Sequence, residues 1–267
     1  SDAFGGSFVP RVGVTKASEK WHGKIMVAQA FRIPGGIIPN RIPVGADAIT
    51  PEKATNLEAE FGYKVSGNSW ITANGFYTFF NDVIVYGANS SGIGTYLNQG
   101  KLGTAGFEVE YRIAFERFKG GISYSFYQPI EDSVNYYRIA NQQDYFLGFA
   151  KHKINMHGSF KIKQNCWINA NARILDKRYS CNMIDLDIFD PNDADNTSVD
   201  VLYKTPAQMI VNANIRLTNF IIENADFTIG VNNITNTKVE FLAPYMSGHG
   251  ALPSHSASLF GKLVYNF

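Results

Sequence analysis

The sequence predicts an all-β protein, and more closely a transmembrane, antiparallel, up-and-down β-barrel with about 11 strands. First, polar and apolar residues alternate with a period of two along most of the chain. Second, the predicted strands are about 10 residues or longer, whereas strands of soluble domains are usually nearer 5 or 6. Third, one face of these strands carries full charges and the other is rich in aromatic residues, as in a barrel with a polar interior and a lipid-facing exterior. A soluble barrel or sandwich also alternates, but the second and third observations count against it.

The composition excludes several other classes of protein. The chain has 267 residues, with 24 Lys and Arg against 23 Asp and Glu, so its formal net charge is +1. A nucleic-acid binder would show a basic patch, and we therefore expect no nucleic-acid partner. Two Cys exclude a disulfide-dense scaffold. There is no run of about 18 apolar residues that could form a transmembrane helix. Residues 1–7 show no export signal, so the chain is either cytosolic or lacks its original beginning.

The alternation defines the strands in chain order. Near residues 54–66, Leu57 and Phe61 share one face, and Glu58 and Glu60 share the other. The same period recurs at Gly106–Ile113, Lys153–Ile162, Trp167–Ile174, Met209–Leu217 and Phe227–Asn232. Together with less regular segments, the predicted strands lie near residues 8–18, 23–32, 54–66, 69–86, 95–115, 117–128, 151–163, 165–178, 206–218, 225–236 and 256–267. Alternate side chains of each strand therefore point to opposite faces of the sheet.

Short and long connections alternate between these strands. Gly67, Glu116 and Gln164 lie in very short turns. The long loops are predicted at residues 33–53, 87–94, 129–150, 179–205 and 237–255. Because an up-and-down sheet places alternate connections at the same end, one end should carry tight turns and the other long loops. This asymmetry is typical of outer-membrane barrels, which have short periplasmic turns and longer outer loops.

Six segments resemble motifs of one known family. The first three lie at Phe8–Gly13, Ala30–Pro34 and Thr50–Glu58, and they resemble the family sequences PRLGL, AFRAP and KPETATNYE in that order. The other three lie at Phe76–Ile84, Tyr96–Glu110 and Val231–Asn236, and they resemble AFYNRIDDLI, YVNAGKARTYGLELE and VNNLFNK in that order. Each motif is weak alone, but their order and spacing extend over nearly the whole chain. The chain is therefore similar to the TonB-dependent receptors of Gram-negative outer membranes.

The resemblance implies that residues 1–267 are the C-terminal part, about half, of a 22-stranded barrel. Such receptors also carry an N-terminal plug domain, which we expect to lie outside this chain, and they sit in the lipid bilayer of the bacterial outer membrane. They take up a scarce nutrient, such as a siderophore, cobalamin or an oligosaccharide, when TonB pulls on the plug. We therefore expect no enzyme activity and no cofactor. Glycan importers of this kind also carry a surface lipoprotein.

Six charged residues are predicted to face the barrel lumen, namely Glu58, Glu60, Glu108, Glu110, Arg112 and Arg173. By the resemblance, wall carboxylates of the family pair with Arg residues of the plug. Because half-buried charges need partners, Glu58, which matches a family motif, is a candidate for this contact. The alternative is a solvated wall in which neighbouring strands pair their charges, and this is favoured for the other five. The chain departs from the family at Glu60, where the family usually has Gly.

Arg32, His249 and His255 are candidates for the ligand side of the barrel. The resemblance implies this for Arg32, whose segment lies near the ligand side in the family, and His249 and His255 lie in a long loop that is expected to face outward. Arg32 could equally be a strand-end residue that reaches the membrane interface. His249 and His255 share their loop with Ser residues, but no nucleophile elbow or oriented acid accompanies them. The five His show no metal-ligand spacing, so we expect neither a metal site nor catalysis.

The chain ends in an alternating apolar strand, in which Leu263, Tyr265 and Phe267 fall on one face. A final strand that ends in an aromatic residue resembles the signal recognised by the bacterial barrel-assembly machinery. This machinery is therefore a further expected partner.

The odd number of strands leaves alternatives open, because bacterial single-chain barrels have even numbers and free strand edges are costly in lipid. Upstream strands or a second polypeptide could complete the barrel. A complete 12-stranded barrel acting as a pore or enzyme, and a structural subunit of an outer-membrane assembly, are the other interpretations. The closed 12-stranded barrel predicts that residues 8–18 pair with residues 256–267.

Overall fold

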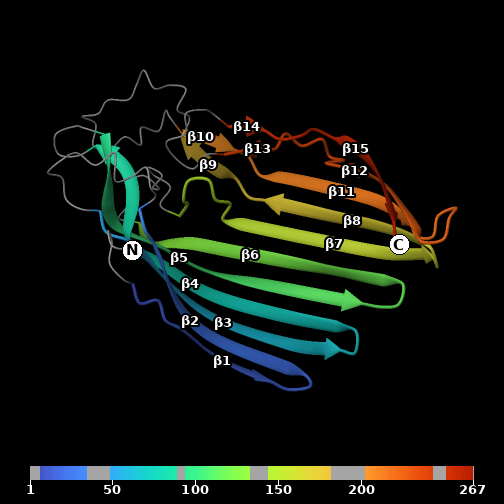
Figure 1. Cartoon of the computed structure of the whole chain (residues 1–267), viewed down its shortest axis with the longest axis horizontal. Coiled ribbons are helices and arrows are strands. Elements are labelled where there is room, and N and C mark those ends of the chain that lie inside the picture. The colour runs from blue at the N-terminus through green and yellow to red at the C-terminus, as the bar shows by residue number, and fades with distance from the viewer. Residues whose placement is uncertain are drawn as a thin grey trace.

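The structure is a computed structural model, and it describes residues 7–34, 49–88, 94–132, 144–181, 202–242 and 251–266. Eleven strands form one curved antiparallel sheet (Figure 1). In order across the sheet they are β1 (Arg11–Ala17), β2 (Trp21–Arg32), β3 (Glu52–Ser66), β4 (Ser69–Ala88), β5 (Gly94–Ala114), β6 (Phe118–Asp132), β7 (His152–Lys163), β8 (Cys166–Leu175), β11 (Gln208–Leu217), β12 (Ala225–Asn232) and β15 (Ser258–Tyr265). The predicted all-β class and the eleven predicted strands are confirmed.

The connections also follow the predicted alternation. Residues 18–20, 67–68, 115–117, 164–165 and 218–224 link consecutive strands at one end of the sheet, which we call the turn end. The long connections lie at the opposite end, which we call the loop end, and the C-terminus lies at the turn end (Figure 1). The sheet is therefore polarised, as a barrel with periplasmic turns and outer loops requires.

The loop end differs from the sequence prediction in detail. The predicted loops at 179–205 and 237–255 contain two additional small hairpins, β9 (Arg178–Cys181) with β10 (Leu202–Thr205) and β13 (Glu240–Phe241) with β14 (Leu252–Pro253). β6 runs on to Asp132, into the predicted loop at 129–150. The sequences of these loop-end strands show little alternation between polar and apolar residues. Beyond the bilayer neither face of a strand contacts lipid, so neither face has to be apolar. No helix in the described segments is long and apolar enough to cross a membrane.

β4 and β5 are much longer than a membrane crossing requires. They have 20 and 21 residues, whereas a tilted strand crosses the bilayer in about 9–11 residues. The hairpin therefore projects beyond the bilayer at the loop end. Val83 and Val85 are 3% and 0% exposed there, and Phe80, Leu97 and Leu102 pack against them. Part of the small apolar core of the described residues thus lies at the loop end, in the projecting β4–β5 hairpin, and not on the membrane-spanning part of the sheet.

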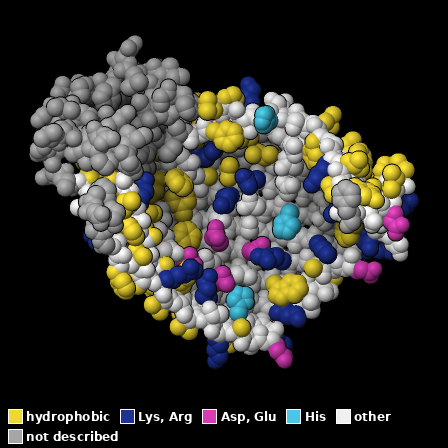
Figure 2. All heavy atoms as spheres, viewed as in Figure 1, with side chains coloured by type: hydrophobic (Ala, Val, Ile, Leu, Met, Phe, Trp, Pro, Cys, Tyr) yellow, Lys and Arg dark blue, Asp and Glu magenta, His cyan; other side chains and the backbone are white. Residues whose placement is uncertain are grey.

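The two faces of the sheet have opposite chemistry. One face exposes large apolar side chains from edge to edge, among them Val14, Ile25, Phe61, Ile229 and Leu263. The other face is hollowed, and charged and His side chains gather in its middle (Figure 2). An apolar outer surface and a polar inner surface are the arrangement of a membrane barrel wall.

The sheet is open, with β1 at one edge and β15 at the other. The 12-stranded alternative requires pairing between these two strands, and the structure does not contain it among the described residues. Because the sheet has eleven antiparallel strands, both edge strands run in the same direction, from the loop end to the turn end. Within the part of the chain that the structure describes, each edge presents one row of backbone N–H and C=O groups without a strand partner.

Candidate functional site

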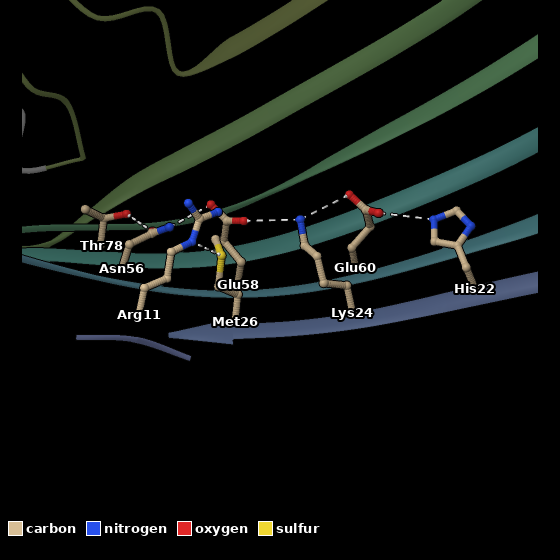
Figure 3. Close-up of polar contacts among 8 residues, drawn as sticks. All are labelled: Arg11, His22, Lys24, Met26, Asn56, Glu58, Glu60 and Thr78. Carbon is tan, nitrogen blue, oxygen red and sulfur yellow. Dashed lines mark hydrogen bonds and ion pairs between the residues drawn. The ribbon is translucent and has the colours of Figure 1, made fainter. Parts of the chain in front are cut away.

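A continuous line of polar groups runs along the inner face of β2, β3 and β4 (Figure 3). The Thr78 hydroxyl donates to Asn56 Oδ1 at 2.6 Å, and Asn56 Nδ2 donates to Glu58 Oε1 at 2.6 Å. The line continues to Lys24, whose Nζ lies 3.8 Å from Glu58 Oε2 and 4.0 Å from Glu60 Oε2. Two carboxylates therefore share one ammonium group.

The line ends at His22, whose Nε2 lies 3.1 Å from Glu60 Oε1. Antiparallel register brings these side chains together, because Lys24 lies opposite Glu60 and His22 lies opposite Gly62. A methyl group at Gly62 would come within 2.1 Å of His22 Cε1. The glycine thus lets the imidazole lie over β3 and reach the carboxylate of Glu60.

Two further carboxylates lie on β5. Glu108 Oε1 accepts a hydrogen bond from the Ser125 hydroxyl at 2.9 Å, and Glu110 forms an ion pair with Arg112 on the same strand. We call Glu58, Glu60, Glu108 and Glu110 the acidic wall. The described contacts give these four carboxylates two permanent cations, Lys24 and Arg112. The four carboxylates of the acidic wall therefore outnumber the permanent cations that contact them.

The opposite half of the inner face, which we call the amide half, carries pairs of Asn side chains together with the cation Arg173. Arg173 Nε donates to Asn155 Oδ1 at 3.2 Å. Arg173, which the sequence predicts to face the lumen, is therefore hydrogen-bonded to a neutral side chain. Asn212 Nδ2 donates to Asn171 Oδ1 at 2.8 Å, and a second Asn pair on the same strands, Asn169 and Asn214, repeats this contact at 2.8 Å. The inner surface therefore differs along the sheet: the carboxylates of the acidic wall lie on β3 and β5, whereas the two Asn pairs and the cation Arg173 lie on β8 and β11.

Four aromatic rings lie over glycines on this inner face. They pair as His22 with Gly62, Phe76 with Gly106, His157 with Gly121, and Phe260 with Gly230. A Cβ atom on each glycine would lie 2.1 to 2.8 Å from an atom of its ring, closer than any real contact. Each ring therefore occupies the space that a side chain on the neighbouring strand would fill.

The loop end contains a clamp built on Glu52, which is 8% exposed. Arg32 Nη2 donates to Glu52 Oε2 at 2.7 Å, and the Ile84 backbone N–H donates to the same oxygen at 3.0 Å. Beside it, Asn98 Nδ2 donates to the backbone carbonyls of Thr50 and Asp82. Arg32 thus joins the ends of β2 and β3 to the base of the β4–β5 hairpin, and its predicted role in ligand contact stays a prediction.

Arg32→Met should loosen the base of this hairpin. Arg32 is the cation that faces Glu52, but its side chain is 62% exposed, so the local cost should be about 1 kcal/mol. Amide exchange of Ile84 should then be faster by a factor of about 5. Hydrogen-exchange mass spectrometry of peptides covering 80–85 measures this change. Arg11→Met, on the exposed edge strand, is the control, and equal exchange in both variants would contradict the clamp.

The remaining predicted site residues are spread over the molecule. His255 takes part through its backbone, because Asn233 Nδ2 donates to its carbonyl at 3.3 Å. Leu263 and Tyr265 lie on the outer face of β15, exposed by 71% and 49%. His249 and Phe267 lie outside the described residues. The structure does not bring Arg32 and His255 into one described cluster.

A second polar cluster at the loop end has no counterpart in the sequence predictions. It centres on Glu240, whose carboxylate accepts from the Tyr203 hydroxyl at 3.1 Å and from the Thr205 hydroxyl at 3.4 Å. Arg178 donates to Gln208 Oε1 at 2.9 Å and to the Glu240 backbone carbonyl at 3.3 Å. Burial lowers the pKa of Arg178 from its usual value. No group of three or more His, Cys, Asp or Glu among the described residues could hold a metal ion.

Comparison with protein families shows to which family this chain belongs. The family profile described as "TonB dependent receptor-like, beta-barrel" matches residues 1–234. The chain belongs to the TonB-dependent receptor β-barrel family. The family resemblance inferred from the sequence motifs is therefore confirmed, and so is the outer-membrane location. TonB-dependent receptors are transporters rather than enzymes, in agreement with the expectation of no catalysis.

Solved structures of TonB-dependent receptors share the fold of this chain. The FrpB iron transporter from Neisseria meningitidis (F3-3 variant) is 17% identical, with a TM-score of 0.67 over 96% of this chain and 38% of that chain. The siderophore receptor PirA from Acinetobacter baumannii is 14% identical, with a TM-score of 0.73 over 100% of this chain and 42% of that chain.

The ferripyoverdine receptor of the outer membrane of Pseudomonas aeruginosa is 14% identical, with a TM-score of 0.70 over 98% of this chain and 33% of that chain. The chain thus spans less than half the length of the solved structures that it matches. No curated protein matches the sequence.

Proposed function

We propose that this chain is the C-terminal part of the barrel of a receptor that takes up a scarce nutrient through the outer membrane. The observation that carries the proposal is the acidic wall, whose four carboxylates outnumber the permanent cations in contact with them, on the inside of a lipid-facing sheet. Charge that is half withdrawn from water needs a partner, and a plug domain with basic side chains would supply one. Siderophores, cobalamin and oligosaccharides are the nutrient classes that we propose.

The open edges support a barrel that other strands complete. Both β1 and β15 run from the loop end to the turn end, so each must be met by a strand that runs the opposite way. The strands that complete the barrel must then be odd in number. A second copy of this chain in the same membrane orientation would bring parallel edges together, which disfavours a homodimeric barrel. We therefore propose that strands and a plug from upstream in the same protein complete it.

Glu58 is our candidate for contact with the plug. Its carboxylate shares Lys24 with Glu60 and is only 25% exposed, so it has remaining capacity to accept hydrogen bonds from a plug guanidinium. The other charged wall residues also have partners within the wall, and Glu58 is preferred because it alone of the six matches the family motif that the sequence analysis assigns to plug contact. TonB would act on the plug, and we propose a surface lipoprotein as a further partner only for an oligosaccharide substrate.

Glu58→Arg should reduce uptake by the complete receptor by about tenfold or more, because reversing a partly buried charge costs more than 1.4 kcal/mol, the equivalent of a factor of ten. Uptake of ferric siderophores, cobalamin and oligosaccharides would be measured separately in cells that depend on this receptor. Asn171→Arg places the same side chain on the amide half of the wall and should leave uptake nearly unchanged. Equal loss in both variants would mean that a cation anywhere in the lumen blocks passage, and would contradict the role of Glu58.

Intact mass and N-terminal sequencing of the protein from an outer-membrane fraction test the architecture. We expect a species well above 29.6 kDa, the mass of these 267 residues, that begins upstream of Ser1. A species of 29.6 kDa would contradict completion by the same polypeptide. A partner chain would then have to provide the missing strands.

A further inference from the structure

The turn between β11 and β12 has an unusual backbone. The Ile222 N–H donates to the Phe220 carbonyl at 2.7 Å, which closes a three-residue turn around Ile221. Ile221 has a φ of 65°, in the left-handed region. Three-residue turns with a positive central φ are rare and strained, and a β-branched residue there is an outlier. The sequence therefore holds an isoleucine where Gly or Asn would be easier to accommodate.

The same turn exposes three consecutive apolar side chains. Phe220, Ile221 and Ile222 are 36%, 87% and 62% exposed. Turns are normally built from Gly, Pro, Asn, Asp and Ser, as at Gly67–Asn68 between β3 and β4. In Figure 1 the β11–β12 connection projects beyond the sheet at the turn end, and hydrophobic side chains gather in that region in Figure 2. We call Phe220, Ile221 and Ile222 the apolar tip.

The apolar tip is continuous with the outer face of the sheet. The Phe220 ring stacks on the Phe227 ring, with centroids 5.6 Å apart and planes at 26°. Phe227 lies opposite Leu217 on β11 and Leu263 on β15, and Leu263 is exposed on the outer face. The turn is therefore attached to the lipid-facing surface and not to the polar lumen.

The base of the turn is fixed by hydrogen bonds. Asp226 accepts from Arg216 and, at 3.3 Å, from the Asn219 N–H. Asn219 Oδ1 in turn accepts from the Asn224 N–H at 2.9 Å. The Phe220 N–H donates to the Ala225 carbonyl at 2.7 Å. These contacts hold the tip in one conformation, so its exposure is a built feature of the turn.

We propose that the apolar tip inserts into the phospholipid interface of the periplasmic leaflet and anchors the turn end of the barrel at that depth. Exposure of Ile221 and Ile222 to water is unfavourable, and transfer to an apolar phase would offset the strain at Ile221. Glu223 follows directly and keeps its carboxylate among the headgroups, which limits insertion to the interface. A periplasmic protein is the other conceivable occupant, but the stacking of Phe220 on the lipid-facing surface favours lipid. This inference does not depend on transport.

A nitroxide spin label at Ile221→Cys tests the depth of the tip. The complete protein, with Cys166→Ser and Cys181→Ser, would be placed in vesicles of phosphatidylethanolamine and phosphatidylglycerol, with relaxants on both sides. Collisions with oxygen, which is enriched in lipid, are compared with collisions with a water-soluble nickel chelate. Asn68→Cys, at the polar β3–β4 turn of the same end, is the matched control. Ile222→Cys provides a second position if Ile221→Cys fails to assemble.

We expect the ratio of oxygen to nickel accessibility at Ile221→Cys to exceed that at Asn68→Cys severalfold. Equal, water-like ratios at the two positions would overturn the proposal. A label that is open to nickel in vesicles but protected in isolated outer membranes would also overturn it, and would assign the tip to a protein partner.

Discussion

Gly106→Ala should abolish, or nearly abolish, assembly of the barrel. A Cβ atom at this position would lie 2.2 Å from the Phe126 carbonyl oxygen, 2.5 Å from Phe76 Cζ and 3.0 Å from Tyr127 Cα. Two of these atoms belong to the backbone of β6, which is hydrogen-bonded to β5 at this point. The added methyl group must therefore separate the strands, at a cost at or above the roughly 3 kcal/mol upper end of ordinary overpacking.

The amount of folded protein in the outer membrane, measured by heat-modifiable electrophoretic mobility, checks this expectation. Gly75→Ala is the control, because nothing lies within 4 Å of a Cβ atom placed there. That variant should assemble as well as the unmodified protein. Normal assembly of Gly106→Ala would mean that β5 and β6 pair differently at this point.

Replacing the outer-face residues of the final strand should reduce delivery to the membrane severalfold without destabilising the folded barrel. Leu263 and Tyr265 are exposed on the outer face of β15, by 71% and 49%, so Leu263 offers most of its surface to lipid in the folded state. We propose that together with Phe267 they are read by the barrel-assembly machinery. A Leu263→Ser, Phe267→Ser variant should therefore accumulate poorly in the outer membrane, since severalfold changes in abundance follow from modest defects.

Refolding into synthetic vesicles without the assembly machinery distinguishes a loss of recognition by the machinery from a loss of stability of the folded barrel. The variant should refold there nearly as well as the unmodified protein, because the loss concerns recognition. Lys262→Ser changes a neighbouring residue of the opposite face and should leave delivery intact. A variant that fails equally in vesicles would show that these side chains stabilise the strand and are not a signal.

The sequence predicts the membrane-spanning part of the fold well, because a wall between lipid and a polar lumen imposes strict alternation. The face of Glu58 and Glu60 follows directly from Leu57 and Phe61 on the other side of the same strand. The loop end is less predictable. β9 and β10 cross no lipid, so their side chains need not alternate, and the prediction places only loops there.

Partners across the sheet could not be predicted, because alternation fixes a face but leaves the register open. Lys24 and His22 therefore do not stand out, although both contact carboxylates that do. Gly62 was an available signal, since a glycine inside a strand often marks close approach by a neighbouring group. The clamp of Arg32 on Glu52 was equally hidden, because the two residues are separated by a long connection.

The four rings that lie over glycines also affect how far side chains extend from the wall into the lumen. His22, Phe76, His157 and Phe260 take up space beside glycines of the neighbouring strand, where a larger residue would push each ring away. Wall groups that do not protrude offer little mechanical resistance to a plug drawn past them by an external force. We propose that the glycines thereby reduce the steric contacts between the wall and a plug, so that a plug is held mainly by charged contacts, which a pull can release one at a time.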